Sequence, residues 1–165
     1  MEIFKVEGEW YVWILGVALL LIVLFMPKKN LTWTGIFVTL GVAGDITWLA
    51  DTVAAVPIDL FDIAKKNTTE LSDTFLLTFV PASIATIYVN FYIPQKKWMF
   101  TVFFTFLSFL LESGLVQVGY MKNIYWKTWY GIPIYFVLFG YFFPWLLRIL
   151  SKKLVKSDFS KEQNN

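Results

Sequence analysis

The sequence predicts an all-α fold: a polytopic transmembrane helical bundle of five spans, with its N-terminus outside and its C-terminus inside. Of the 165 residues, 58% are hydrophobic and only 16% are charged, whereas a soluble domain averages about 25% charged residues. The apolar residues gather in five stretches, and a helix needs about 20 such residues to cross a bilayer. Lys and Arg concentrate in alternate connections, which is the pattern that sets orientation.

The first span is expected at residues 10–26. It follows an acidic N-terminus and ends at Pro27 and the pair Lys28–Lys29. A secretory signal peptide instead begins with a positively charged region and ends at a small-residue cleavage site. We therefore expect a helix that is retained in the protein.

The other spans are expected at about 31–53, 74–93, 98–120 and 128–150, so that residues 1–150 form one transmembrane domain. Residues 151–165 then form a basic cytoplasmic tail. The connection 54–73 mixes apolar and acidic residues. It is either an interfacial half-helix, with Ile58, Leu60 and Phe61 in the headgroup region, or a plain connector.

The distribution of cations sets the orientation, because cytoplasmic connections carry an excess of Lys and Arg. Five spans place nine cations on one side: Lys28, Lys29, Lys96, Lys97, Arg148, Lys152, Lys153, Lys156 and Lys161. Five lie on the other side: Lys5, Lys65, Lys66, Lys122 and Lys127. The first side is therefore the cytoplasmic one.

The tryptophans agree with this arrangement, because Trp is enriched where a bilayer meets water. Those near the outer ends of spans are Trp10, Trp13, Trp48, Trp126 and Trp129. Those near the inner ends are Trp33, Trp98 and Trp145. The placement therefore supports a membrane protein, and the surrounding bilayer is its first partner.

Three acids fall inside the spans, namely Asp45, Asp51 and Glu112. A carboxylate at bilayer depth is costly and usually faces the bundle interior or a water-filled cavity. Asp45 and Glu112 each lie 14 residues beyond the inner start of their span, about 21 Å along the helix. We expect both to point into the bundle at one level, with Tyr135 near enough to donate a hydrogen bond. Asp51 is expected near the outer interface.

The acids share helix faces with small and hydroxylated residues, which form stripes at helical spacing. The stripe on span two consists of Gly41, Gly44, Asp45, Trp48 and Thr52, that on span three of Ser83, Thr86 and Asn90, and that on span four of Thr101, Thr105, Ser108, Glu112 and Gly119. Such stripes allow close approach and hydrogen bonding between helices. They are either packing seams or the lining of a polar cavity. We expect the Asn90 amide to hydrogen-bond a neighbouring helix.

Enzyme chemistry has little support in the composition. The chain has no His and no Cys, which removes the commonest general base and the thiolate nucleophile. Asp45 and Asp51 lie on one helix, about 120° apart in projection, so they cannot face each other as a catalytic dyad does. A metal enzyme that uses carboxylates alone stays open. We expect no cofactor, and the net charge of +2 gives a nucleic-acid partner little support.

Several segments also resemble an uncharacterised family of small multi-span integral membrane proteins of Gram-positive spore-forming bacteria. They are Trp48–Phe61, Val80–Pro81 with Asn90–Tyr92, Phe109–Glu112 with Gly119–Tyr120, and Trp126–Tyr130. The resemblance covers residues 40–150 and leaves span one outside. It implies a plasma-membrane location and a multi-span fold, and no activity. The matching motifs contain Asp51, Pro57, Pro81, Asn90, Glu112 and Trp129.

Two functional hypotheses follow. In the first, the protein binds or transports a cation, a proton or a small polar solute through a polar interior around Asp45 and Glu112. The polar interior would also include Asp51, Asn90, Thr105, Ser108 and Tyr135. In the second, the protein is a structural or accessory subunit that packs against a second copy or a partner membrane protein. Transport requires a water-accessible carboxylate, whereas packing requires only a hydrogen-bonded one.

Overall fold

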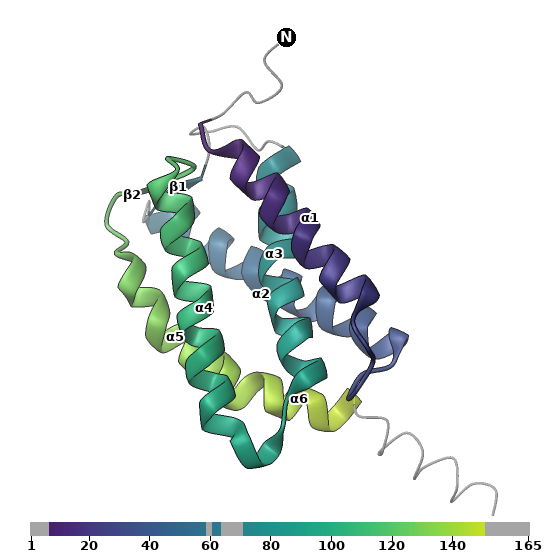
Figure 1. Ribbon diagram of the computed structural model, residues 1–165. Helices are drawn as coiled ribbons and strands as arrows, with labels where there is room; N and C mark the ends of the chain where they lie inside the picture. Colours follow the sequence, from purple (N-terminus) through teal and green to yellow (C-terminus); the bar gives the residue numbers. More distant parts are fainter. Residues whose placement is uncertain (1–6, 59–60, 64–70, 151–165) are drawn as a thin grey trace, which may run out of the picture.

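The computed structural model describes residues 7–58, 61–63 and 71–150 (Figure 1). Within these residues, four helices are long and apolar enough to cross a membrane: Trp33–Val53, Leu71–Phe91, Pro94–Gln117 and Thr128–Leu150. The first apolar helix, α1 (Glu9–Phe25), has 17 residues and is shorter. The predicted helical fold is therefore confirmed, while the number of crossings and the orientation stay predictions.

The helices begin and end close to their expected limits, with one difference. Helix α1 starts after Gly8, whose φ of 74° is left-handed, and ends before Pro27. Helix α2 (Trp33–Ile58) continues five residues beyond Val53, where the span was expected to end. The expected connector 54–73 therefore begins as helix. It goes on to the short strand β1 (Phe61–Ile63), and residues 59–60 and 64–70 lie outside the described part.

Strand β1 pairs antiparallel with β2 (Met121–Asn123), so the fold is not purely helical. The ribbon joins the connection after α2 to the connection after α4 (Lys97–Gln117). A left-handed turn at Gly119 (φ 79°) leads into β2.

Next to this turn, the buried Tyr120 hydroxyl donates a hydrogen bond to Asp73 Oδ1 at 2.6 Å. The bond connects this end of α4 to the first turn of α3 (Leu71–Phe91). Burial, reinforced by the Asp73 carboxylate, raises the pKa of the Tyr120 phenol above its ordinary value.

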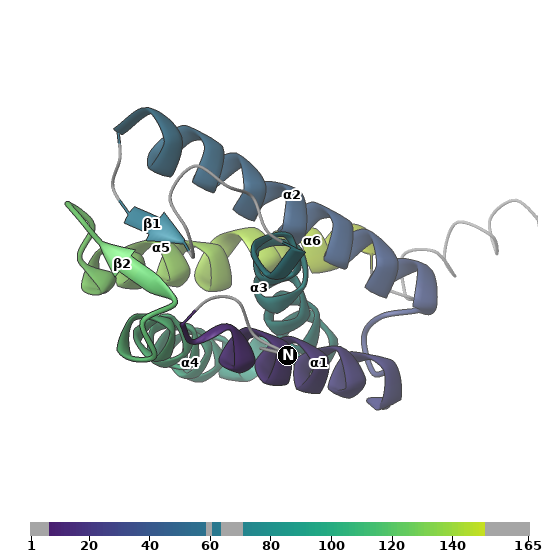
Figure 2. The same ribbon diagram turned by 90° about the horizontal axis from the view of Figure 1, so that it is seen from above.

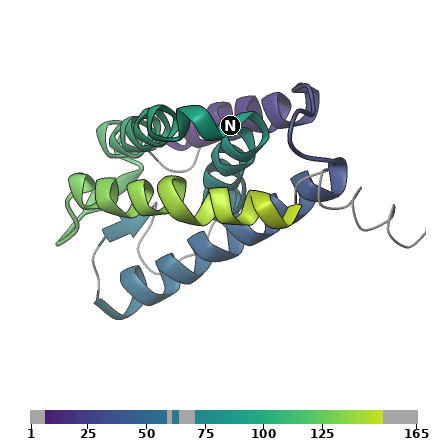
Figure 3. The ribbon, with the colours of Figure 1, turned by 90° about the horizontal axis from the view of Figure 1, so that it is seen from below.

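Helix α3 is the centre of the molecule. In the most apolar 18-residue stretch of α3, 61% of the residues are buried, against 22–28% in the corresponding stretches of the other three long helices. Figures 2 and 3 show three layers, with α2 on one side, α3 and the last helix in the middle, and α1 with α4 on the other side. From above, α3 and α4 are seen nearly end-on, whereas α1, α2 and the last helix lie across the view (Figure 2). The helices therefore cross at large angles.

The last helix is continuous from residue 128 to residue 150 but irregular. It consists of the 3-10 turn η2 (Thr128–Tyr130), α5 (Gly131–Val137), the π-helical turn η3 (Leu138–Phe142) and α6 (Phe143–Leu150). In the π turn the Phe139 carbonyl accepts hydrogen bonds from the Tyr88 hydroxyl of α3 and, at 3.4 Å, from Thr101 Oγ1 of α4. The helix bends there, so that α5 runs beside α4 while α6 passes the end of α3 (Figure 1).

Two asparagines fasten the connection between α1 and α2 to the end of α3. Asn90 Oδ1 accepts from the backbone N–H groups of Lys29 (3.0 Å) and Leu31 (3.3 Å), and its Nδ2 donates to the Pro27 carbonyl (2.8 Å). In return, Asn30 Nδ2 donates to the carbonyls of Val89 (3.2 Å) and Tyr92 (2.8 Å). Val89 lies in the last turn of α3 and Tyr92 directly follows the helix, and carbonyls at a helix C-terminus have no partner within the helix.

We expect Asn90→Leu to lower the free energy of unfolding by about 1–3 kcal/mol, because it leaves three backbone groups without their partner at a fully buried position. The measurement is an SDS titration of the folded protein in mild detergent. Asn123→Leu is the matched control, since Asn123 is exposed and makes one exposed hydrogen bond. An equal effect of the two substitutions would contradict this role of Asn90.

Candidate functional site

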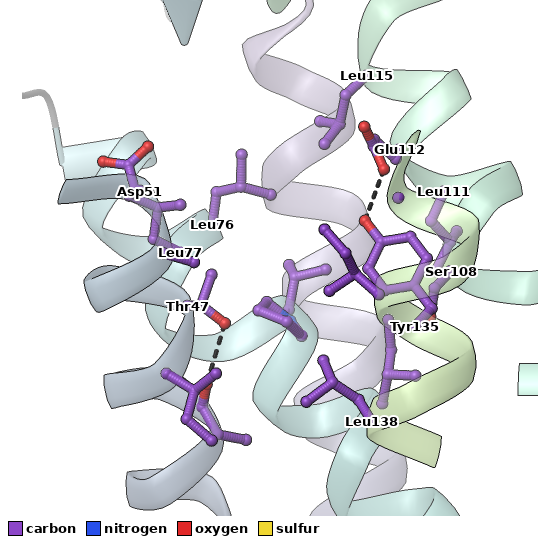
Figure 4. Close-up of a pocket in the computed structure, with 18 of the residues that line it drawn as sticks. Thr47, Asp51, Leu76, Leu77, Ser108, Leu111, Glu112, Leu115, Tyr135 and Leu138 are labelled. Carbon is purple, nitrogen blue, oxygen red and sulfur yellow. Dashed lines mark hydrogen bonds between the residues drawn. The ribbon is translucent and has the colours of Figure 1, made fainter. Parts of the chain in front are cut away.

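A cavity of about 390 Å³ lies at the centre of the molecule (Figure 4). All the long helices contribute to its wall, together with one residue each from α1, β1 and β2. Most of the lining side chains are apolar, among them Leu76, Leu77, Ile84, Leu111, Leu115 and Leu138. Concave, mainly apolar cavities with a few converging polar groups are the usual form of small-molecule sites. The polar interior expected from the sequence is therefore a largely apolar one.

Glu112 of α4 is a polar group of the cavity wall that is bonded on both carboxyl oxygens. Its Oε1 accepts from the indole N–H of Trp126 at 2.8 Å, and its Oε2 accepts from the Tyr135 hydroxyl at 2.6 Å. Both donors are neutral, and none of the described lining residues is a Lys or an Arg. The carboxyl group is thus held in one orientation, with no cation of the cavity wall to neutralise it.

Gly131 makes this arrangement geometrically feasible. It is the first residue of α5, and a Cβ added there would lie 2.8 Å from Glu112 Oε2 and 2.9 Å from the Tyr135 ring. Only a residue without a side chain lets the start of α5 come so close to α4. The approach aligns Tyr135, one turn further on, with the carboxylate.

Further polar groups line the wall away from Glu112. Asp51 and Thr47 come from α2, and Figure 4 shows Asp51 on the opposite side of the cavity from Glu112. The Thr47 hydroxyl donates to the Ala43 carbonyl of its own helix at 3.0 Å. Ser108 lies one turn before Glu112 on α4. The cavity thus has one carboxyl group held by two hydrogen bonds and a second, half-buried one on its opposite side, on α2.

Asp45 is not part of this site, and the predicted shared site of Asp45 and Glu112 is wrong. The residues of α2 that line the cavity are Ala43, Ile46, Thr47, Ala50 and Asp51. They form one helical stripe, and Asp45 lies about 200° around the helix from Ala43. Accordingly Asp45 is exposed. The prediction rested on the equal depth of Asp45 and Glu112 along their helices, and it placed Asp45 on the same face as Gly44. In the structure, the face of α2 that packs on α3 contains Gly44 and not Asp45.

Two other predicted residues lie outside the cavity wall. Asn90 is buried at the end of α3 and bonds the connection between α1 and α2, not a neighbouring helix. Thr105 is buried on α4, and its hydroxyl has no hydrogen-bond partner among the described residues. Conversely, the sequence predicts Trp126 only as one of the tryptophans at the membrane–water interface. Its indole reaches Glu112 because the connection before α5 folds back over the cavity, which periodicity along a helix does not reveal.

The chemistry available at this site is binding by a carboxyl group. Within the described residues, no group of three or more His, Cys, Asp or Glu side chains could hold a metal ion. Glu112 has two hydrogen bonds, and a carboxylate can accept about four. Free acceptor capacity beside an apolar wall suits a ligand that combines a donor or cationic group with an apolar body.

We expect Gly131→Ala to disturb the Glu112–Tyr135 pair and to destabilise the folded protein by about 1–3 kcal/mol, because the new methyl group overlaps the carboxylate or the ring. Gly41→Ala is the matched control. A Cβ at Gly41 meets no atom within 4 Å, so this helical substitution should be neutral or stabilising by up to about 1 kcal/mol. Detergent unfolding of the two variants compares them, and equal stability would contradict the packing described for Gly131.

The function must be argued from this site, because comparison of the chain with protein families, curated proteins and solved structures found no match.

Proposed function

We propose that the protein is an integral membrane protein of a bacterial plasma membrane that crosses the bilayer five times, with its N-terminus outside. Helix α1 supports a fifth crossing, because its 17 residues extend about 26 Å and a short span is accommodated by local thinning of the bilayer. The nine cations assigned above to the inner side support the orientation. Exposed aromatic and aliphatic side chains along the long helices suit contact with lipid.

The topology is tested with single cysteines, since the chain has none of its own. Gln95 and Asn123 are both exposed and lie at opposite ends of α4. An impermeant maleimide applied to intact cells should label Asn123→Cys and leave Gln95→Cys unlabelled. Both should react once the cells are permeabilised. Labelling of only Gln95→Cys in intact cells would reverse the orientation.

We further propose that the protein binds a small membrane-soluble molecule in the central cavity, and that this molecule carries an ammonium group on an apolar body. The observation that carries the proposal is the Glu112 carboxyl group, held by Trp126 and Tyr135 with no cation among the described lining residues. An ammonium group would supply the missing charge and the missing donors. The apolar wall would bury the remainder of the molecule.

The proposed ligand is more specific than the cation, proton or small polar solute expected from the sequence. A hydrated ion or a small polar solute would leave most of the wall without a suitable partner, because the majority of the lining side chains are aliphatic or aromatic. The cavity is bounded by α2 on one side and by α4 and α5 on the other. An amphipathic ligand can reach such a site from within the bilayer, where it is already concentrated.

Dodecylamine and 1-dodecanol, which differ in head group and share one chain, test the proposal with protein in lipid nanodiscs. At about 100 times its dissociation constant, the amine should raise the unfolding temperature by about 5 °C or more, and the alcohol should raise it less. Glu112→Gln should remove the preference for the amine, because the amide carries no charge.

Asp45→Asn is the matched control, since it neutralises a different acid that lies outside the cavity. The preference for the amine should persist in this variant. A preference that survives in Glu112→Gln, or disappears in Asp45→Asn, would reject Glu112 as the binding group.

A further inference from the structure

One acid of α2 has no role in the cavity. Asp45 lies on the exposed side of α2, and no described residue forms a hydrogen bond or ion pair with it. It is 12 residues after the first and 8 before the last residue of the membrane-crossing segment Trp33–Val53. These spacings correspond to about 18 Å and 12 Å along the helix. An Asp side chain is too short to reach the water at either end.

In the proposed membrane such a carboxylate would face lipid in the isolated chain. Acids within spans are costly and pair with other groups of the protein or line wet cavities. The cations of the long helices are Lys96, Lys97 and Arg148, among the described residues, and all three lie near helix ends, away from Asp45 at mid-helix. A partner for Asp45 would then come from another molecule.

The surface around Asp45 has room for another helix. Phe37, Gly41, Asp45 and Leu49 follow each other at intervals of four residues on this side of α2, and we call them the Asp45 face. Phe37 and Leu49 are 78% and 64% exposed, and the space above Gly41 is open to 4 Å. A glycine one turn from a polar residue lets a second helix come close enough for a hydrogen bond.

We propose that the Asp45 face binds a transmembrane helix of another protein, and that this helix carries a Lys or Arg at the depth of Asp45. Charge decides between this occupant and a second copy of the chain. A symmetric dimer through the Asp45 face would bring two Asp45 side chains together, and two carboxyl groups that share a site cannot both stay ionised. A basic helix supplies both the opposite charge and the hydrogen-bond donors.

Two synthetic transmembrane peptides test this interface in phosphatidylcholine vesicles: a Leu/Ala-rich helix with one central Lys, and the same helix with Leu at that position. The full chain carries an acceptor dye on Gln95→Cys, and energy transfer from donor-labelled peptide reports binding. The Lys peptide should bind about tenfold more tightly than the Leu peptide. The preference should disappear with Asp45→Leu and persist with Asp45→Glu.

Glu112→Gln separates this interface from the cavity, and the preference for the Lys peptide should persist in that variant. Equal binding of the two peptides to the unsubstituted chain would overturn the proposal, as would a preference that survives Asp45→Leu. Energy transfer between copies of the chain without peptide, lost on Asp45→Leu, would show that a second copy occupies the face instead. Asp45 is exposed, so its substitution tests binding without a change in the packed interior.

Discussion

The structure depends on the position of α3, because the surrounding helices are held through polar contacts with it. A bilayer supplies little hydrophobic force between helices, so packing and hydrogen bonds must hold them together. Thr78 accepts the indole N–H of Trp48 from α2 at 3.0 Å, Asp73 bonds the end of α4 through Tyr120, and Tyr88 bonds the last helix. Asn90 bonds the connection that joins α1 and α2.

The cavity is a consequence of this arrangement. Helices α2 and α6 both pack on α3, and side chains from α4 and α5 fill the space beside them only in part. Glu112 is ordered there because α5 begins with a glycine against it and the preceding connection places Trp126 beside it. Three segments, α4, α5 and the connection before α5, therefore meet at Glu112. The opposite wall consists of residues of α2 and α3, among them Asp51, Leu76 and Leu77 (Figure 4).

The helices were largely predictable, because Pro27 and Pro94 interrupt long apolar runs and the polar connections separate the others. The β ribbon was not, since its strands have three residues each and are defined by pairing between segments about 60 residues apart. Within the site, Glu112 and Tyr135 were predictable, because an acid inside a membrane needs a hydrogen-bond donor at its own depth in the bilayer. The prediction for Asp45 was wrong because apolar residues surround α2 on every side, so hydrophobic periodicity does not distinguish the packed face from the exposed one.

The π turn at Leu138–Phe142 has a consequence for how the two ends of the last helix are related. A π turn contains one residue more than an α turn, so α6 is rotated by about 100° and shifted by about 1.5 Å relative to a regular helix. Leu138, Phe139 and Phe143, which lie in or directly after this turn, form part of the cavity wall. If the turn relaxed to α-helical geometry, the wall would be rebuilt and α6, with Arg148, would turn about its own axis in the same movement. The irregular turn thus fixes both the shape of this part of the cavity wall and the direction in which α6 presents its side chains.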